Sequence, residues 1–225
     1  MPINITQLNI DEVLRYMGCP PDKAEPNIRA LAENCAVLMV SAIHPRWAYL
    51  VQDIAQEQDG IQLACGLLLP GKDLKCHLKE CQRAVLFCAT LGVEGDNLIR
   101  CAQSVDMARA LALDCCATVA VEQVCDQIER ELQAMFPDCF FPYRFSPGYG
   151  DLPLSLQPEL LSLLDAPRRV GLCASDSHIL IPRKSVTAIL GVADEPIKQN
   201  IRSCVSCPAH ESCQYRKAGG HCGIS

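Results

Sequence analysis

The stretch Tyr143-Arg144-Phe145-Ser146-Pro147-Gly148-Tyr149-Gly150 separates an apolar, helix-rich part of the chain from a more strand-like part after it. Pro147 fixes its own φ and favours an extended Ser146, while Gly148 and Gly150 permit turns that other residues rarely adopt. These residues predict a kinked loop with exposed backbone amides and one fixed cation, Arg144. Because a guanidinium binds a carboxylate through two parallel hydrogen bonds, such a loop suits a small carboxylate ligand. Taken alone, the stretch also fits an ordinary Pro-Gly turn with a surface arginine.

The segment before this loop has the periodicity of helices. From residue 96 to residue 136 there is no glycine or proline, and apolar residues recur every three or four positions. This spacing predicts a short helix and then a long one, with Ser104 as the cap of the second and Pro137 after its end. Residues 84–90, Ala-Val-Leu-Phe-Cys-Ala-Thr, form the best candidate for a central buried strand.

The remaining elements indicate a mixed fold. Helices are predicted at residues 5–17, capped by Thr6 or Asn9, and at residues 27–34 and 156–164. Strands are predicted at residues 35–43, 61–69, 169–174 and 185–192, with the last two paired antiparallel. Helices and strands alternate without a regular βαβ rhythm, so the sequence predicts an α+β fold.

Composition limits the functions that the chain can have. Its 225 residues are 49% hydrophobic and 20% charged, which is typical of a folded domain with or without an appendage. The net charge of −6 argues against binding to nucleic acid. The N-terminal sequence resembles no signal peptide and no apolar run has the length of a membrane span, so we expect a cytoplasmic protein without a membrane partner.

Sixteen cysteines stand out in a chain that lacks a secretory signal, and they predict thiols or metal ligands instead of disulfides. Twelve precede residue 200, and most of these lie among Ala, Val and Leu, where a free thiol packs as a small hydrophobic group. The other four predict one metal centre in a tail over residues 201–225. A 4Fe–4S cluster, zinc and a metal-free reactive tail remain the three alternatives, and the presence of only one Cys-x2-Cys pair disfavours a standard zinc ribbon. The four are Cys204, Cys207, Cys213 and Cys222.

An ordered set of motifs resembles the C-terminal activation domain of cobalamin-dependent methionine synthase. The set comprises Arg144-x-x-Pro147-Gly148-Tyr149, a short helix, Val170-Gly-Leu-Cys-Ala-Ser-Asp-Ser-His178, and Ile181-Pro-Arg-Lys-Ser-Val-Thr-Ala188. The resemblance is clearest over residues 138–192 and extends loosely back to about residue 84. It implies an activation domain over residues 1–200, built as a twisted, mainly antiparallel sheet with flanking helices.

That family binds S-adenosylmethionine, and the resemblance carries this role to the matching loop. Arg144 would hold the methionine carboxylate of the ligand. Backbone groups of the loop would hold its amine and adenine regions, with Pro147, Gly148 and Tyr149 at the matching positions.

Other site residues carry over less directly. Phe145 and Ser146 replace small residues of the family motif, so only their backbone roles are implied. Asp138, six residues before the loop arginine, is a further candidate for an acidic contact. Asp176 and Ser177 match an acidic-Ser pair that would shape the same groove, with a plain strand-ending turn as the alternative.

The chemistry that the resemblance implies is reductive reactivation of cobalamin, in which one electron and the methyl group of S-adenosylmethionine regenerate methylcobalamin from the cobalt(II) form. Asp176-Ser-His178 begins an Asp-x-His-x-x-Gly pattern, but Ile181 stands where the cobalamin-ligating motif needs glycine. Cobalamin would therefore arrive on a partner, either a methionine synthase without its own activation domain or another corrinoid protein. The electron would come through the tail, which favours the 4Fe–4S alternative, or from a flavodoxin or ferredoxin.

Two rival functions remain open from the sequence. The chain could be a non-enzymatic docking module for a corrinoid protein, with structural zinc in its tail, instead of a working part of a methyltransferase assembly. A radical S-adenosylmethionine enzyme is disfavoured, because the Cys-x3-Cys-x2-Cys signature of that class is absent.

Overall fold

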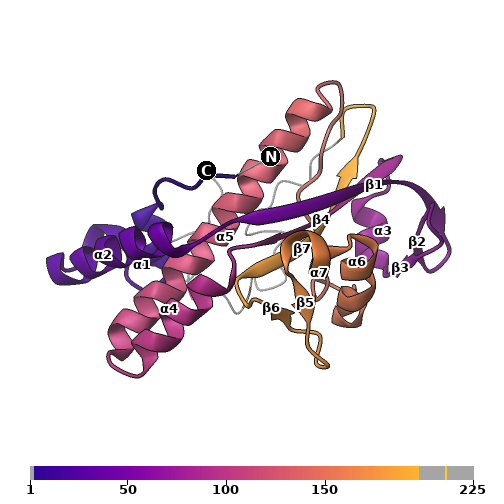
Figure 1. Cartoon of the computed structure of the whole chain (residues 1–225). Coiled ribbons are helices and arrows are strands. Elements are labelled where there is room, and N and C mark those ends of the chain that lie inside the picture. Colours follow the sequence, from indigo (N-terminus) through magenta and orange to yellow (C-terminus); the bar gives the residue numbers. More distant parts are fainter. Residues whose placement is uncertain (1–2, 198–210, 212–225) are drawn as a thin grey trace.

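A five-stranded antiparallel sheet in the order β3-β2-β1-β4-β7 forms the centre of the protein. We describe it from a computed structural model, which describes residues 3–197 and 211 (Figure 1). The sheet is built from β1 Arg46–Glu57, β2 Gly60–Leu63, β3 Leu68–Pro70, β4 Arg83–Thr90 and β7 Ser185–Val192.

The middle of the sheet follows from the most apolar strand of the chain. All residues of β4 except Arg83 are buried, and Leu86 lies opposite Leu50 of β1 and Ile189 of β7. Alternate residues of β4 enter two different hydrophobic clusters, because successive side chains of a strand point to opposite faces. The predicted central strand at residues 84–90 and the predicted strand at residues 185–192 are both confirmed.

Helices cover both faces of the sheet (Figure 1). One face carries α1 Ile10–Tyr16, α2 Pro26–Ala42, α4 Val93–Gln103 and α5 Met107–Met135. The other carries α3 Lys72–His77, α6 Gln157–Leu163, α7 Ala166–Val170 and the small hairpin of β5 Cys173–Ala174 and β6 Leu180–Ile181. Short 3-10 turns occupy Pro21–Lys23 and Leu154–Leu156.

The N-terminal cap of α1 is the predicted one, whereas the cap of α5 is not. Asn9 caps α1 by accepting from the amides of Asp11 and Glu12, as predicted, although the helix begins only at Ile10. The predicted cap Ser104 instead ends α4, and Asp106 caps α5 by accepting from the amides of Ala108 and Arg109. The predicted break between the two helices is present, but the cap of the second helix is Asp106, two residues after Ser104.

The predicted strand at residues 35–43 is wrong, because α2 runs unbroken from Pro26 to Ala42. Its buried residues Ala32, Cys35, Ala36 and Met39 follow the pattern i, i+3, i+4, i+7, which is that of one helix face. Val37 is exposed between them, whereas a buried strand would cover both of its faces. A short apolar run does not distinguish the two structures by itself.

Strand β1 was not predicted, and residues 61–69 form a hairpin instead of one strand. Six of the twelve β1 residues are half-buried and five are exposed, so the strand lacks a clear apolar alternation. Its second half extends past β4 and pairs with β2, as at Ile54 opposite Leu63. Gly66, with φ 94°, turns the chain from β2 into β3.

Residues 169–174 also differ from the prediction of a strand paired with residues 185–192. The first of them complete α7, and Gly171 ends that helix with φ 72°. The remainder forms β5, which pairs with β6, while β7 pairs with β4. The arginines in the last turn of α7 suit a helix C-terminus, since they complement its negative dipole.

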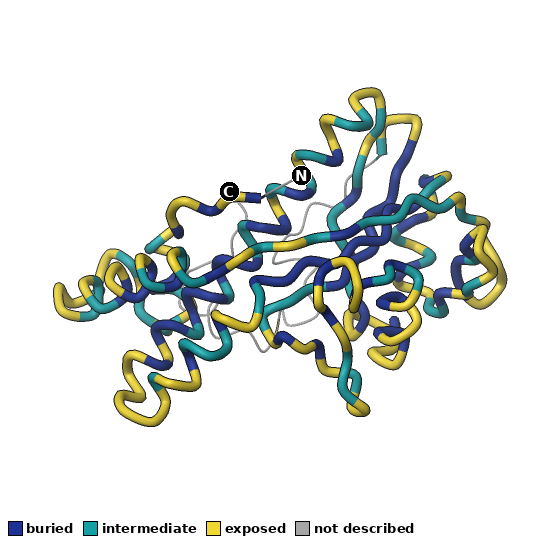
Figure 2. The backbone as a smooth tube through the Cα atoms, in the orientation of Figure 1, coloured by how far each residue is buried: buried dark blue, intermediate teal, exposed yellow. Residues whose placement is uncertain are grey.

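Burial is concentrated along the sheet and along the side of α5 that faces it, while hairpin tips and helix ends are exposed (Figure 2). In the described residues, no helix is both long enough and apolar enough to cross a bilayer. The predicted α+β class, with a mainly antiparallel sheet and flanking helices, is confirmed.

Candidate functional site

The loop at residues 143–150 is held against the outer edge of β7. The amide of Phe145 donates to the carbonyl of Ile189 at 2.9 Å, and the amide of Ile189 donates back at 2.7 Å. The Phe145 side chain is 6% exposed and packs in the cluster beneath α6. Since neighbouring residues of an extended segment point to opposite sides, this fixes Arg144 toward the other face.

Arg144 reaches α5 and pairs there with three carboxylates. Its Nη2 lies 2.5 Å from Glu122 Oε2, and its Nη1 lies 2.9 Å from Asp126 Oδ1 and also contacts Glu129. The three acids are spaced four and three residues apart, so they share one face of the helix. We name these four residues the Arg144 cluster.

The charge of the Arg144 cluster is unbalanced toward the negative. Burial acts to lower the pKa of the Arg144 guanidinium, but the negative charge of Glu129 and its neighbours raises that pKa above its ordinary value. The arginine therefore stays cationic. Three carboxylates and one guanidinium leave a formal charge of −2, which would attract a cationic ligand.

After Arg144 the chain makes the turn that its glycines predict. Gly148 and Gly150 have φ values of 92° and 51°. The amide of Tyr149 donates to the carbonyl of Ser146 at 3.0 Å, and the amide of Gly148 to that of Leu152 at 2.8 Å. Pro147 is buried beneath the turn, whereas the residues from Gly148 to Gly150 face solvent. The turn thus presents backbone and an exposed tyrosine at the surface.

Asp138 and Asp176 lie apart from the Arg144 cluster. Asp138 is exposed after the end of α5, at the far end of the segment that runs along β7 to the loop. Asp176 and Ser177 form the exposed turn between β5 and β6, and Leu180 of that hairpin packs in the cluster on the other face of the sheet from α5. Both aspartates thus lie on other segments than α5, and their contacts with a ligand stay predictions.

Sequence reasoning missed the three acidic partners of the arginine. Glu122, Asp126 and Glu129 were covered by the general prediction of a long helix. A signal was available, because three acids follow one another at helical spacing in a helix whose other face is apolar. The spacing of the acids does not predict which cation they bind, because Arg144 lies 15 to 22 residues further along the chain.

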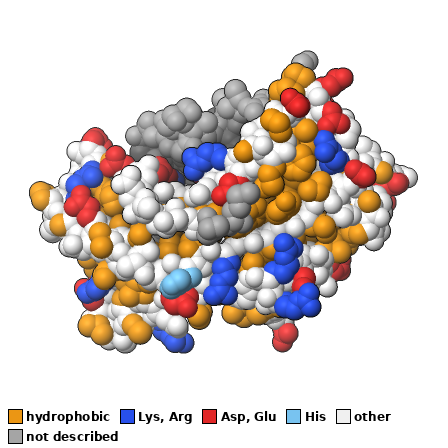
Figure 3. Space-filling model, turned by 45° about the horizontal axis from the view of Figure 1, so that its top comes forward, with side chains coloured by type: hydrophobic (Ala, Val, Ile, Leu, Met, Phe, Trp, Pro, Cys, Tyr) orange, Lys and Arg blue, Asp and Glu red, His pale blue; other side chains and the backbone are white. Residues whose placement is uncertain are grey.

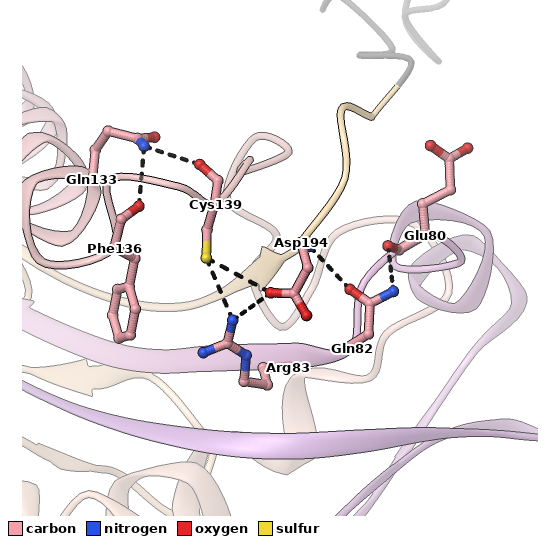
Figure 4. A network of polar contacts seen from close by, with 7 residues as sticks. All are labelled: Glu80, Gln82, Arg83, Gln133, Phe136, Cys139 and Asp194. Atoms are coloured by element: carbon pink, nitrogen blue, oxygen red, sulfur yellow. Dashed lines mark hydrogen bonds and ion pairs between the residues drawn. The ribbon is translucent and has the colours of Figure 1, made fainter.

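A polar network fixes the segment that leads into the loop (Figure 4). Arg83, at the start of β4, donates to Asp194 Oδ1 at 2.6 Å and to the Cys139 thiol sulfur at 3.4 Å. Gln82 accepts from the amide of Asp194 at 3.1 Å, and Gln133 of α5 donates to the carbonyl of Cys139 at 3.0 Å. The chain between α5 and the loop is therefore tied to the ends of both β4 and β7.

Basic side chains gather over β1 and α7 on the face seen in Figure 3. Arg168 and Arg169 lie exposed in the last turn of α7, and Arg169 donates to the carbonyl of Tyr49 in β1. A Cβ atom on Gly171 would lie 3.9 Å from Nη1 of Arg46, which places that arginine beside the end of α7. The net negative charge is thus unevenly distributed, with this basic surface on other elements than the Arg144 cluster.

The predicted metal ligands Cys204, Cys207, Cys213 and Cys222 lie outside the described residues, so the metal centre stays a prediction. Within residues 3–197, no group of three or more Cys, His, Asp and Glu side chains is arranged to hold a metal ion. Of the twelve cysteines in that range, six are buried, as expected for thiols that act as small hydrophobic groups. Burial raises the pKa of Cys116 and of Cys125 to about 12.

Comparison with known proteins gives a likeness of fold. No protein-family model matches the chain, and no curated protein matches it. Among solved structures, the chain is similar to the MetH reactivation domain bound to AdoHcy, with a TM-score of 0.60 and 14% sequence identity. The alignment covers 88% of this chain and 82% of that one. The chain therefore has the fold of a reactivation domain, as the motifs around Arg144 predict.

Proposed function

We propose that this protein binds S-adenosylmethionine at the Arg144 loop and acts as a free-standing activator of a cobalamin-dependent methionine synthase or a related corrinoid methyltransferase. The observation that carries the proposal is the loop itself, seated at the sheet edge with its arginine among acids and its glycine turn open to solvent. The reactivation-domain fold supports it, because the similar solved domain holds AdoHcy, which is what remains of S-adenosylmethionine after loss of its methyl group.

The charges of the cluster complement those of the proposed ligand. S-adenosylmethionine carries a carboxylate, an ammonium group and a sulfonium, so its net charge is positive. The guanidinium of Arg144 would bind the carboxylate, and one of the acids of α5 would bind the ammonium group. The ligand would bring two positive groups and one negative group, so binding would reduce the formal charge of −2 on the cluster to about −1.

The residues of the chain have to position the ligand more than activate it. When bound, S-adenosylmethionine supplies a methyl group already made electrophilic by its sulfonium, and the methyl passes to reduced cobalt while the C–S electron pair returns to sulfur. No general base is needed for this transfer. The exposed backbone at Gly148 and Tyr149 leaves one side of the loop open, which a partner carrying cobalamin would need.

The partner and the electron source belong to the proposal as well. Cobalamin would be carried by a separate methionine synthase or corrinoid protein. One electron would come from a flavodoxin or ferredoxin, or through a 4Fe–4S cluster in the tail of residues 201–225. The division into an activation domain at residues 1–200 and a metal-binding tail follows the same reasoning.

A second candidate function rests on the ion pairs of Arg144. An arginine that three carboxylates already contact can have a purely structural role, in which it attaches the loop to α5. The protein would then be a non-enzymatic docking module for a corrinoid protein, with structural zinc in its tail. The two functions differ in whether S-adenosylmethionine binds at all.

Isothermal titration of the full chain with S-adenosylmethionine and with AdoHcy tests the proposal. We expect both to bind, and Arg144→Ala to weaken binding at least about tenfold through loss of one charge-assisted contact. Arg168→Ala is the matched control, since that guanidinium lies on α7 and is 86% exposed. Binding that is equally tight in the Arg144 variant would remove the site assignment, and no binding by the wild type would favour the docking module.

A further inference from the structure

Helix α3 contacts the Arg144 loop at the residue directly before the arginine. Nε2 of His77 lies 2.7 Å from the backbone carbonyl oxygen of Tyr143. A carbonyl oxygen only accepts hydrogen bonds, so Nε2 carries the proton and donates it. The peptide unit that is held this way is the one that links Tyr143 to Arg144.

The His77 ring also packs against the aromatic residues on either side of Arg144. Its centroid lies 4.1 Å from that of Tyr143 and 5.4 Å from that of Phe145, with tilted planes in both cases. These contacts restrict the ring to one orientation, which aims its N–H at the carbonyl. His77 therefore combines a directed hydrogen bond with the packing that fixes its direction.

The other end of the loop is attached to the same helix. Asp151 accepts hydrogen bonds from the amides of Lys72 at 2.7 Å and Asp73 at 3.1 Å, at the start of α3. Gly150 approaches so closely that a Cβ atom there would lie 2.4 Å from Oδ2 of Asp73. Helix α3 is thus a bracket that holds the loop at both ends, with His77 at the end nearer to the arginine.

We propose that His77 is a positioning residue for the Arg144 site, an inference that rests on the proposed function of that site. A peptide unit is planar and rigid, so fixing the Tyr143 carbonyl also fixes the N and Cα atoms of Arg144, and the bonds of Phe145 to Ile189 restrain the chain on the other side of this residue. The guanidinium then meets the acids of α5 from one defined angle. Loss of the His77 hydrogen bond would remove one restraint on this peptide unit, and the added freedom of the arginine would have to be lost on binding, which lowers ligand affinity.

Variants of His77 separate the hydrogen bond from the packing. His77→Phe keeps a ring and removes the donor, whereas His77→Gln places an N–H near the position of Nε2 without a ring. His77→Asn carries an amide on a side chain too short to reach the carbonyl, and it provides a second test without this hydrogen bond if the Phe variant does not fold. His44→Gln is the control, because that histidine is exposed near Glu94, on other elements than α3 and the loop.

The measurement is S-adenosylmethionine affinity by titration, together with amide hydrogen exchange of Gly148 and Tyr149 in ligand-free protein. We expect the Phe and Asn variants to bind about tenfold more weakly and to exchange these amides faster, because one directed hydrogen bond is lost. The Gln variant should stay within about threefold of the wild type, as a rescue by donor chemistry alone. A purely structural role of the ring would instead make the Phe variant the better one.

Outcomes for His77 and for the proposed function can be told apart. Wild-type affinity in the Phe and Asn variants would overturn the positioning role and leave the binding site intact. If the wild type itself does not bind S-adenosylmethionine, the proposed function is wrong. In that case amide exchange still tests His77, because unchanged exchange in the Phe and Asn variants would overturn its role in holding the loop. Faster exchange in those variants, reversed in the Gln variant, supports it in either case.

Discussion

Replacing Arg144 by methionine tests whether the Arg144 cluster holds the loop in the ligand-free protein. Methionine keeps an unbranched stem but removes the guanidinium, which is 12% exposed, while its partners Glu122, Asp126 and Glu129 are 43%, 57% and 30% exposed. A pair on the surface contributes about 0.2–1 kcal/mol, and breaking a fully buried one costs about 3–5 kcal/mol. The cluster lies between these limits, so we expect Arg144→Met to lower the free energy of unfolding by about 2 kcal/mol.

Part of this loss comes from repulsion among the acids that remain. Three carboxylates on one helix face repel each other by about 0.2–0.5 kcal/mol per pair once the cation is gone. Adding Glu129→Gln to Arg144→Met should therefore recover about 0.5 kcal/mol, although each substitution destabilises the protein on its own. Salt at about 1 M should reduce the difference in the free energy of unfolding between Arg144→Met and the wild type, because it screens the repulsion between the exposed acids.

Urea unfolding followed by circular dichroism measures these free energies. The control is Arg168→Met, which removes a guanidinium that is 86% exposed and paired with Asp165, and it should cost less than about 0.5 kcal/mol. The reasoning fails if Arg144→Met costs no more than this control, or if adding Glu129→Gln to it makes the protein less stable still. Either result would mean that Phe145, the backbone bonds to β7 and the contacts with α3 hold the loop without a contribution from the Arg144 cluster.

Three further predictions concern packing and pH. Gly191→Ala should destabilise the protein by about 1–3 kcal/mol, because the new Cβ would lie 2.5 Å from the buried Cys81 sulfur. A melting temperature of the variant equal to that of the wild type would contradict this. Gly95→Ala should stabilise it by about 0.5–1 kcal/mol, since this helical glycine has only ordinary contacts at 3.6 Å, and a lowered urea midpoint would count against it. Burial raises the pKa of the Cys88 thiol from 9.0 to about 11 and that of Cys125 to about 12, so the unfolded chain loses these protons first as the pH rises. The stabilisation by the two neutral thiols is complete below pH 9.0 and is lost as the pH rises toward these folded-state pKa values, by about 1 kcal/mol each near pH 10. Cys125→Ala should therefore make the decline of the urea midpoint with pH shallower. An unchanged decline would refute the raised pKa of Cys125 as its cause.

The elements that the sequence predicted well are those with one dominant signal. Strand β4 is apolar from Ala84 to Ala89 and β7 is largely apolar, and both form as predicted. Helix α5 has a long uninterrupted period, and the glycines after Arg144 turn the chain as their conformational freedom indicates. In these places local propensity and tertiary packing favour the same structure.

The errors arise where tertiary structure decides. The apolar run at residues 35–43 fits a strand or a helix until its packing against α5 is known. Strand β1 is half-buried where it pairs with β4 and exposed toward its end, where it pairs with β2, so it carries no continuous apolar signal. The partners of Arg144 depend on which helix face meets the loop, and a single sequence does not contain that information. The contacts of Asp138 and Asp176 with a ligand stay predictions, and both residues lie exposed on segments outside α5.

The segment at residues 140–145 also has a consequence for solubility. It covers the outer edge of β7, with Phe140 and Ala193 exchanging hydrogen bonds at 2.8 and 2.9 Å and Phe145 bonded to Ile189 further along. An uncovered edge of an apolar strand is a template on which a second chain can add a strand. The segment that carries the proposed ligand site thus also protects the sheet from aggregation, and changes that detach residues 140–145 from β7 would favour association of chains through this edge.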